Sequence, residues 1–140
     1  MEKIIKETEP KRHILKNSLR AFLVGGMICS IAQFFIELLN KTGLEKNEVN
    51  ALAVTIMVFL GALLTGLGVY DKIGQFGGCG SIVPITGFAN SMTSSALEYK
   101  SEGLFLGILT NMFKLAGSVI VTGVISSYLI GTIRYLLGLL

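Results

Sequence analysis

The stretch VYDKIGQFGGCGSIVPITGFANS, residues 69–91, decides which fold this chain can adopt. It follows a long apolar segment and carries five glycines, which lower the stability of an isolated helix. Pro84 removes a backbone hydrogen-bond donor and disfavours helical geometry in the residue before it. We therefore expect a Gly/Pro-broken or re-entrant segment. Such irregular backbone is tolerated at membrane depth only where protein buries it or where it lines a watery cavity.

The composition around this stretch is that of an integral membrane protein. Hydrophobic residues make up 51% of the 140 residues and charged residues only 15%, whereas soluble domains carry about 25% charged residues. The charges gather in residues 1–20, 37–48 and 71–102. We expect an all-α fold, a small polytopic membrane protein with three or four transmembrane helices and the broken segment between the second and the last of them.

Three segments have the length and composition of membrane spans, at about residues 18–40, 50–70 and 115–138. Residues 71–114 are the expected broken or re-entrant region. Together these segments are expected to form a single transmembrane domain, residues 18–140.

Residues 1–17 form a basic tail. Lysine and arginine outnumber the acids there, whereas the loop at residues 41–49 holds only two lysines. A basic excess beside the first span holds that end in the cytoplasm, so we expect a cytoplasmic N-terminus. No aromatic residue lies among these charges before Phe22, which favours a membrane over nucleic acid as the partner of the tail.

The sequence contains no recognised enzyme motif. Cys29 and Cys79 lie far apart and form no CxxC pair, which argues against a zinc site or a disulfide framework. His13 is the only histidine and lies in the tail, where a solvated side chain is expected. We predict no catalytic residue, no metal site and no cofactor.

Polar groups inside or beside the apolar segments are the remaining candidates for function. Lys114 interrupts a long apolar run, and an unpaired ionisable group in a membrane is costly. The alternative interpretation is that Lys114 is an interface residue whose side chain extends to the lipid headgroups, with residues 104–113 as a separate short helix. Asn90 could offer a hydrogen bond to a polar solute. The candidates for a pore or solute path are Asp71, Gln75, Pro84, Asn90 and Lys114.

Two further groups suggest contacts rather than a path. Glu98, Lys100 and Glu102 cluster in a polar turn, which indicates either a solvated turn or a contact with a partner. Small residues spaced by four allow another helix to approach closely. The last span has such a stripe, which we predict to be a helix-packing face: Gly123, Ser127 and Gly131.

Four strings of the sequence resemble the stage V sporulation protein AC family: YDKIGQF, PITGFANSM, ALEYKSEG and NMFKLAG. The likeness extends from about Val24 to Arg134. Cys79 stands where the family is expected to have a small residue such as alanine, and the loop KTGLEKNEV is shorter than expected.

This resemblance implies a subunit of a complex in the inner membrane of the forespore and spore. The complex is expected to take up dipicolinic acid, as its calcium chelate, during sporulation and to release it in germination, with channel activity that responds to membrane tension. The implied partners are a homologous stage V AE-type membrane subunit and a soluble AD-type subunit, in a homo- or hetero-oligomer. The alternative is a membrane scaffold that docks a soluble partner and conducts nothing.

Overall fold

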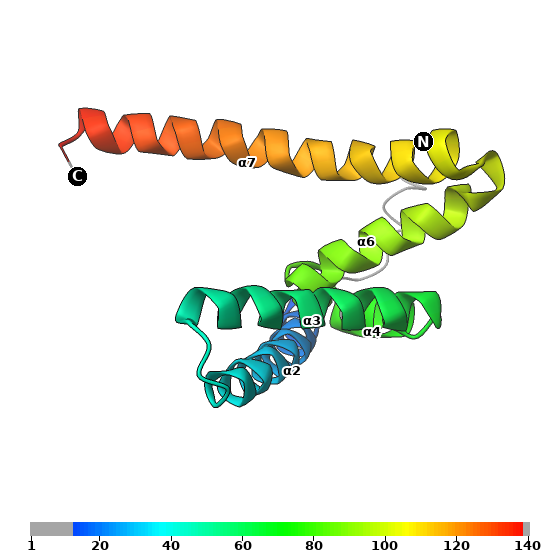
Figure 1. The fold of residues 1–140 in the computed structure, drawn as a ribbon, viewed down its shortest axis with the longest axis horizontal. Coiled ribbons are helices and arrows are strands. Elements are labelled where there is room, and N and C mark those ends of the chain that lie inside the picture. The colour runs from blue at the N-terminus through cyan, green and yellow to red at the C-terminus, as the bar shows by residue number, and fades with distance from the viewer. Residues whose placement is uncertain (1–12, 139–140) are drawn as a thin grey trace.

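The computed structural model describes residues 13–138, which contain helices and no strand (Figure 1). The first two long helices are α2 (Ile14–Asn40) and α3 (Lys46–Gly66). The short turn between them ends in a capping box, in which the Glu45 N–H donates to the Glu48 carboxylate at 3.2 Å. Together with the helical run Leu104–Leu136, these are three helices long and apolar enough to cross a membrane. The predicted all-α membrane fold is confirmed.

The helices start and end somewhat differently from the expected spans. Helix α2 begins four residues earlier than the expected start at residue 18. Helix α3 stops at Gly66, and Gly68 then turns the chain with a φ of 69°, so Tyr70 starts the next helix instead of ending the span. A positive φ carries no steric penalty at glycine, which explains the sharp end of this apolar helix.

The Gly/Pro-rich stretch is broken, as predicted. It forms three helical pieces: α4 (Tyr70–Gly77), α5 (Cys79–Ile82) and α6 (Ile85–Glu98). Gly78, with a φ of 51°, separates the first two pieces. Pro84 begins α6 with an extended ψ of 159°.

The proline break lies one residue later than expected. We expected Val83 to leave helical geometry, but it keeps φ −68° and ψ −41°. Its N–H donates to the Cys79 carbonyl at 3.0 Å, and this bond of the short α5 holds it in the helical region. The change of direction therefore falls on Pro84 itself.

A tight hairpin joins α6 to the last helix. A 3₁₀ turn, η1 (Tyr99–Glu102), is followed by Gly103 at a φ of 99° and by a π-helix, η2 (Leu104–Leu109). The π-helix continues without a break into α7 (Thr110–Leu136). Residues 104–114 were expected in the broken region, but leucine, methionine and lysine are good helix formers and no proline interrupts them. Lys114 therefore lies inside a continuous helix.

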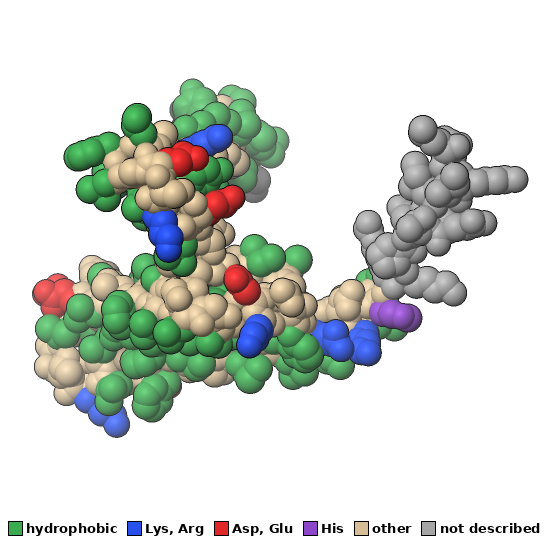
Figure 2. Space-filling model, turned by 90° about the vertical axis from the view of Figure 1, so that its right-hand side faces the viewer, with side chains coloured by type: hydrophobic (Ala, Val, Ile, Leu, Met, Phe, Trp, Pro, Cys, Tyr) green, Lys and Arg blue, Asp and Glu red, His purple; other side chains and the backbone are tan. Residues whose placement is uncertain are grey.

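The packed part of the fold is formed by α2 to α6. Helix α6 contacts α3, while α4 and α5 contact α2 (Figure 1). Buried side chains at these contacts include Val24, Met57, Tyr70 and Ala89. Helix α7 has no buried residue and lies apart from α2 and α3 (Figure 1). In the second view, the hairpin end is joined to the α2–α3 body through a narrow waist, and acidic and basic side chains lie close together around it (Figure 2).

Candidate functional site

The broken region is held together by the hydroxyl of Tyr70. This buried hydroxyl donates a hydrogen bond to the Ser81 carbonyl oxygen at 2.8 Å, and its oxygen lies 2.7 Å from the Thr86 hydroxyl oxygen. Ser81 and Thr86 are also buried. One side chain of α4 thus fixes the positions of α5 and of the start of α6, because a buried polar group that loses its partner costs about 1–3 kcal/mol.

A second polar contact ties α6 to α3. The Thr65 hydroxyl lies 2.7 Å from the Asn90 amide oxygen and 2.7 Å from the Gly61 carbonyl oxygen. Asn90 is half-buried and Thr65 is buried. Asn90, a predicted solute contact, thus has a hydrogen-bond partner within the fold, and its contact with a solute remains a prediction.

A polar groove runs between α6 and the first turns of α7. Its volume is about 460 Å³. Helix α6 contributes Ser91, Ser94, Ser95 and Glu98. Helix α7 contributes Asn111, Lys114, Leu115 and Ser118, and Tyr99 also lines the groove. We call this the α6–α7 groove.

Helical periodicity explains why these side chains share one groove. Residues 91, 94, 95 and 98 are spaced by three and four, as are residues 111, 114, 115 and 118, so each set lies on one helix face. The hairpin then turns the two faces toward each other. Gly107 makes the tight approach possible, since a Cβ on it would collide with the Tyr99 carbonyl oxygen.

The groove is chemically mixed and carries one cation and one anion. The Ser91 hydroxyl donates to Gly87 at 3.1 Å and the Ser118 hydroxyl donates to Leu115 at 2.8 Å, both within their own helices. Their oxygen lone pairs are left to accept hydrogen bonds from a solute or its water. Lys114 supplies donors and Glu98 supplies a carboxylate. The arrangement can bind a solute that presents both negative and positive groups.

The groove lies at one end of the apolar part of α7. After Lys114, residues 115–133 are uncharged, and Arg134 follows. These 19 residues are about 28 Å long as a helix, close to the thickness of a membrane's hydrocarbon core. Lys114 and Arg134 therefore have the spacing of charges at two opposite membrane surfaces. The separate short helix that was the alternative for residues 104–113 is not observed.

The other predicted residues are distributed over different parts of the fold. Asp71 is exposed in the first turn of α4, and Pro84 lies at the start of α6, outside the groove. Glu98 lines the groove, whereas Lys100 and Glu102 are exposed on the η1 turn and do not line it. The groove thus unites Lys114 with Glu98, which the sequence had placed in separate groups.

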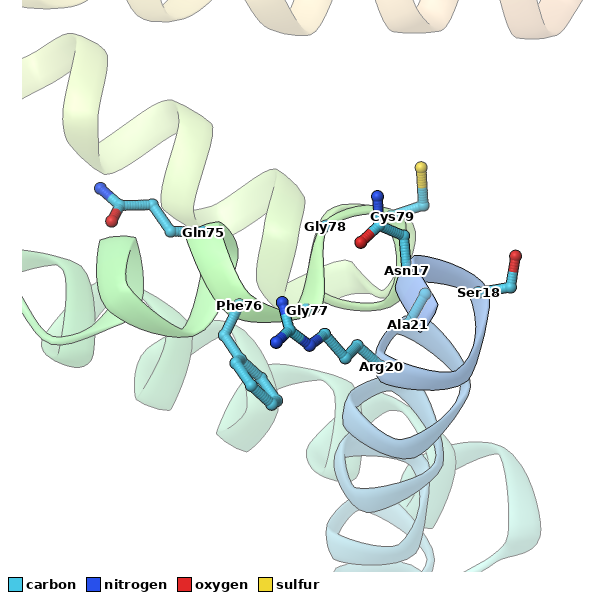
Figure 3. A pocket seen from close by; sticks show the side chains of 9 residues that line it. All are labelled: Asn17, Ser18, Arg20, Ala21, Gln75, Phe76, Gly77, Gly78 and Cys79. Carbon is cyan, nitrogen blue, oxygen red and sulfur yellow. The ribbon is translucent and has the colours of Figure 1, made fainter. Parts of the chain in front are cut away.

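Gln75 lines a second pocket, between the first turns of α2 and the bend from α4 to α5 (Figure 3). The pocket has a volume of about 410 Å³. In it the Arg20 guanidinium lies 4.8 Å from the centre of the Phe76 ring. We call this the Arg20 pocket.

The predicted helix-packing stripe has no partner within the described chain. A Cβ added at Gly123 or Gly131 would meet no atom within 4 Å, and residues 119–136 are exposed throughout. A role of Gly123, Ser127 and Gly131 in packing between chains stays a prediction. Among residues 13–138, no three His, Cys, Asp or Glu side chains are grouped as a metal site would require.

Sequence reasoning missed the serines of α6, together with Asn111 and Ser118. Their spacing by three and four in an apolar chain was a usable signal, but it becomes a groove only when two helices form a hairpin. Arg20 and Phe76 were missed for a different reason. They are far apart in the sequence, and no local pattern relates them.

A model of the SpoVAC/SpoVAEB sporulation membrane protein family matches residues 17–133 of the chain. The chain belongs to this family. It is 55% identical over 135 residues to Stage V sporulation protein AC of Bacillus subtilis (strain 168). The aligned region covers 94% of this chain and 88% of that protein. No solved structure matches the chain. The family likeness inferred from the four sequence strings is confirmed, and family members are sporulation membrane proteins.

Proposed function

We propose that this chain is a subunit of a channel or transporter for dipicolinic acid in the inner membrane of the forespore and spore. The solute moves as its calcium chelate, inward during sporulation and outward in germination, and membrane tension opens the path. The N-terminus lies in the cytoplasm. Membership of the sporulation family supports the setting, and the α6–α7 groove is the observation that carries the transport role.

The chemistry of the groove suits this solute. Dipicolinate is a planar dianion that becomes neutral overall when it binds calcium. Lys114 can donate to a carboxylate of the chelate, since charge-assisted hydrogen bonds are the stronger ones. Glu98 and the hydroxyl oxygens can accept hydrogen bonds from the water around the calcium ion. A lining with one cation and one anion favours a neutral chelate over a free ion of either sign.

One chain supplies only part of such a path. Three spans cannot enclose a pore of useful width, and the groove is open along one side, with Lys114 and Ser118 exposed. The path therefore requires several subunits around a shared axis, with a homologous AE-type membrane subunit completing the groove. The exposed charges Lys100 and Glu102 on the η1 turn are available to contact the soluble AD-type subunit.

Flux from liposomes tests the proposal. The chain is reconstituted with its membrane partner in vesicles loaded with calcium dipicolinate, and release is followed under osmotic tension. Lys114→Gln removes the cation of the groove, and we expect release to slow about tenfold, equivalent to about 1.4 kcal/mol. Lys41→Gln, outside the groove at the C-terminal end of α2, is the matched control and should leave release unchanged.

Two results would contradict the proposal. If the wild-type pair releases no dipicolinate under tension, the chain is the non-conducting scaffold that docks a soluble partner. In that case Lys100→Glu on the η1 turn should abolish binding of the soluble subunit. If Lys114→Gln and Lys41→Gln release the solute at equal rates, the path does not run through the α6–α7 groove.

A further inference from the structure

The Arg20 pocket is a second, differently built site that the transport role does not use. The bend between α4 and α5 lies directly on the first turns of α2 (Figure 3). A Cβ at Gly77 would be 2.7 Å from a methyl carbon of Val24, and one at Gly80 would collide with the Ala21 carbonyl oxygen. These close contacts fix the bend against α2, so the walls of the pocket are preformed.

The pocket carries the positive charge expected of a site that binds an anion. Of the residues that the structure describes, Arg20 is the only charged one that lines the pocket, and the neutral polar residues Asn17, Ser18 and Gln75 line it as well. The guanidinium carbon of Arg20 lies over the Phe76 ring, 4.8 Å from its centre, and Figure 3 shows the two side chains next to each other. A cation–π contact of this kind orients the guanidinium and leaves its N–H edge available. Arginine presents that edge to phosphate or carboxylate oxygens as a pair of parallel donors.

The position of the pocket favours phosphate on a lipid. Arg20 is followed by 16 uncharged residues, 21–36, so it lies where α2 leaves the hydrocarbon core and reaches the headgroups. Among residues 13–138 no carboxylate lines the pocket, so this part of the chain offers no partner there for the ammonium of a zwitterionic headgroup. We propose that the Arg20 pocket binds the phosphate group of an anionic phospholipid at the membrane surface that holds the N-terminal end of α2. A free phosphate ion offers the same chemistry, and the test separates the two sources.

Lipid titration of the purified full chain in detergent tests this site. Binding is counted by native mass spectrometry for short-chain phosphatidylglycerol, short-chain phosphatidylcholine of the same length, and inorganic phosphate. We expect phosphatidylglycerol to bind about tenfold more tightly than phosphatidylcholine, which corresponds to about 1.4 kcal/mol. Arg20→Gln should remove this preference. Lys72→Gln removes a nearby charge outside the pocket and should keep it.

A second variant keeps the test valid if Arg20→Gln fails to fold. Asn17→Asp is nearly isosteric and places a negative charge in the pocket, at an exposed residue. It should weaken phosphatidylglycerol binding about tenfold, whereas Asn50→Asp, exposed on α3, should not. Equal losses in Arg20→Gln and Lys72→Gln, or no loss in Asn17→Asp, would overturn the site. If inorganic phosphate binds as tightly as phosphatidylglycerol, the anion site stands and the lipid assignment is wrong.

Discussion

The most apolar parts of helix α3 and of the helix that runs from Leu104 to Leu136 have almost the same mean hydropathy, 2.0 and 1.8, but very different surroundings. In the most apolar part of α3, 28% of the residues are buried within the chain, against 6% in the last helix. Hydropathy therefore does not determine which membrane helix packs. The difference comes from small residues that meet a neighbour's backbone: Gly61 of α3 would place a Cβ 3.0 Å from the Thr86 carbonyl oxygen, whereas Gly123 of α7 faces open space.

The glycines of this one chain serve different purposes. Gly61 of α3 and three glycines of the broken region, Gly77, Gly80 and Gly87, bring helical segments close together within the subunit. The glycines in the far part of α7 have no neighbour among residues 13–138. No described part of the chain covers this part of α7, so its sequence is free to serve assembly.

Replacing a glycine of each region gives the largest expected difference. A Cβ at Gly80 would collide with the backbone of Ala21, which cannot rotate away, so Gly80→Ala should lower the free energy of unfolding by about 3 kcal/mol. Gly123→Ala, in open space on a helix, should leave stability unchanged or raise it by about 0.5–1 kcal/mol. Unfolding in detergent, followed by circular dichroism, measures both. Equal effects would mean that the two regions do not differ as the structure indicates.

Two tyrosines provide a second, smaller contrast. Tyr70→Phe removes the hydroxyl that joins α4 to Ser81 and Thr86, and it should cost about 1–2 kcal/mol because both partners are buried. Tyr128, which is 74% exposed on α7, is the matched control. Tyr128→Phe should change the free energy of unfolding by less than about 0.5 kcal/mol. A shift of similar size in both variants would show that the Tyr70 hydrogen bonds do not stabilise the broken region.

The sequence predicted those parts of the fold that depend on local chemistry. The apolar runs predicted the three spans, and the glycines and Pro84 predicted the breaks between helices. The continuity of the last helix through Lys114 was not predicted, because one charge in an apolar run was read as an interruption although lysine favours helices. The contact of Arg20 with Phe76 was out of reach, since it depends on how the α4–α5 bend lies on α2. Lys114 was identified as a candidate, whereas its neighbour Glu98 was assigned to a partner contact.

The link between Thr65 and Asn90 allows a structural role to be separated from a transport role. Thr65→Val and Asn90→Ala should each cost about 1 kcal/mol of stability, and a double-mutant cycle should show a coupling of about 0.5–1 kcal/mol. If Asn90 only joins α6 to α3, both variants should slow dipicolinate release equally. If Asn90 also contacts the solute, Asn90→Ala should slow release several-fold more than Thr65→Val does. An absence of coupling would show that the two side chains do not hold each other.

The predicted stripe on α7 should have the smallest effect on the isolated chain. Ser127 belongs to the stripe, and Ser126 lies next to it on another face of the same exposed helix. Ser127→Leu and Ser126→Leu should both change the free energy of unfolding by less than about 0.5 kcal/mol, because neither side chain has a neighbour to displace. Association between chains, measured by energy transfer between labelled copies in bilayers, should distinguish them.

In that measurement Ser127→Leu should weaken association about fivefold, since a bulky side chain prevents the close approach that a small-residue face allows. Ser126→Leu should leave association unchanged. The pair is matched in residue type, in depth along α7 and in exposure, so a difference between them can come only from the face that each occupies. If both variants associate as the wild type does, lipid covers the far part of α7, and the subunits meet along the more polar surface of the α6–α7 groove instead.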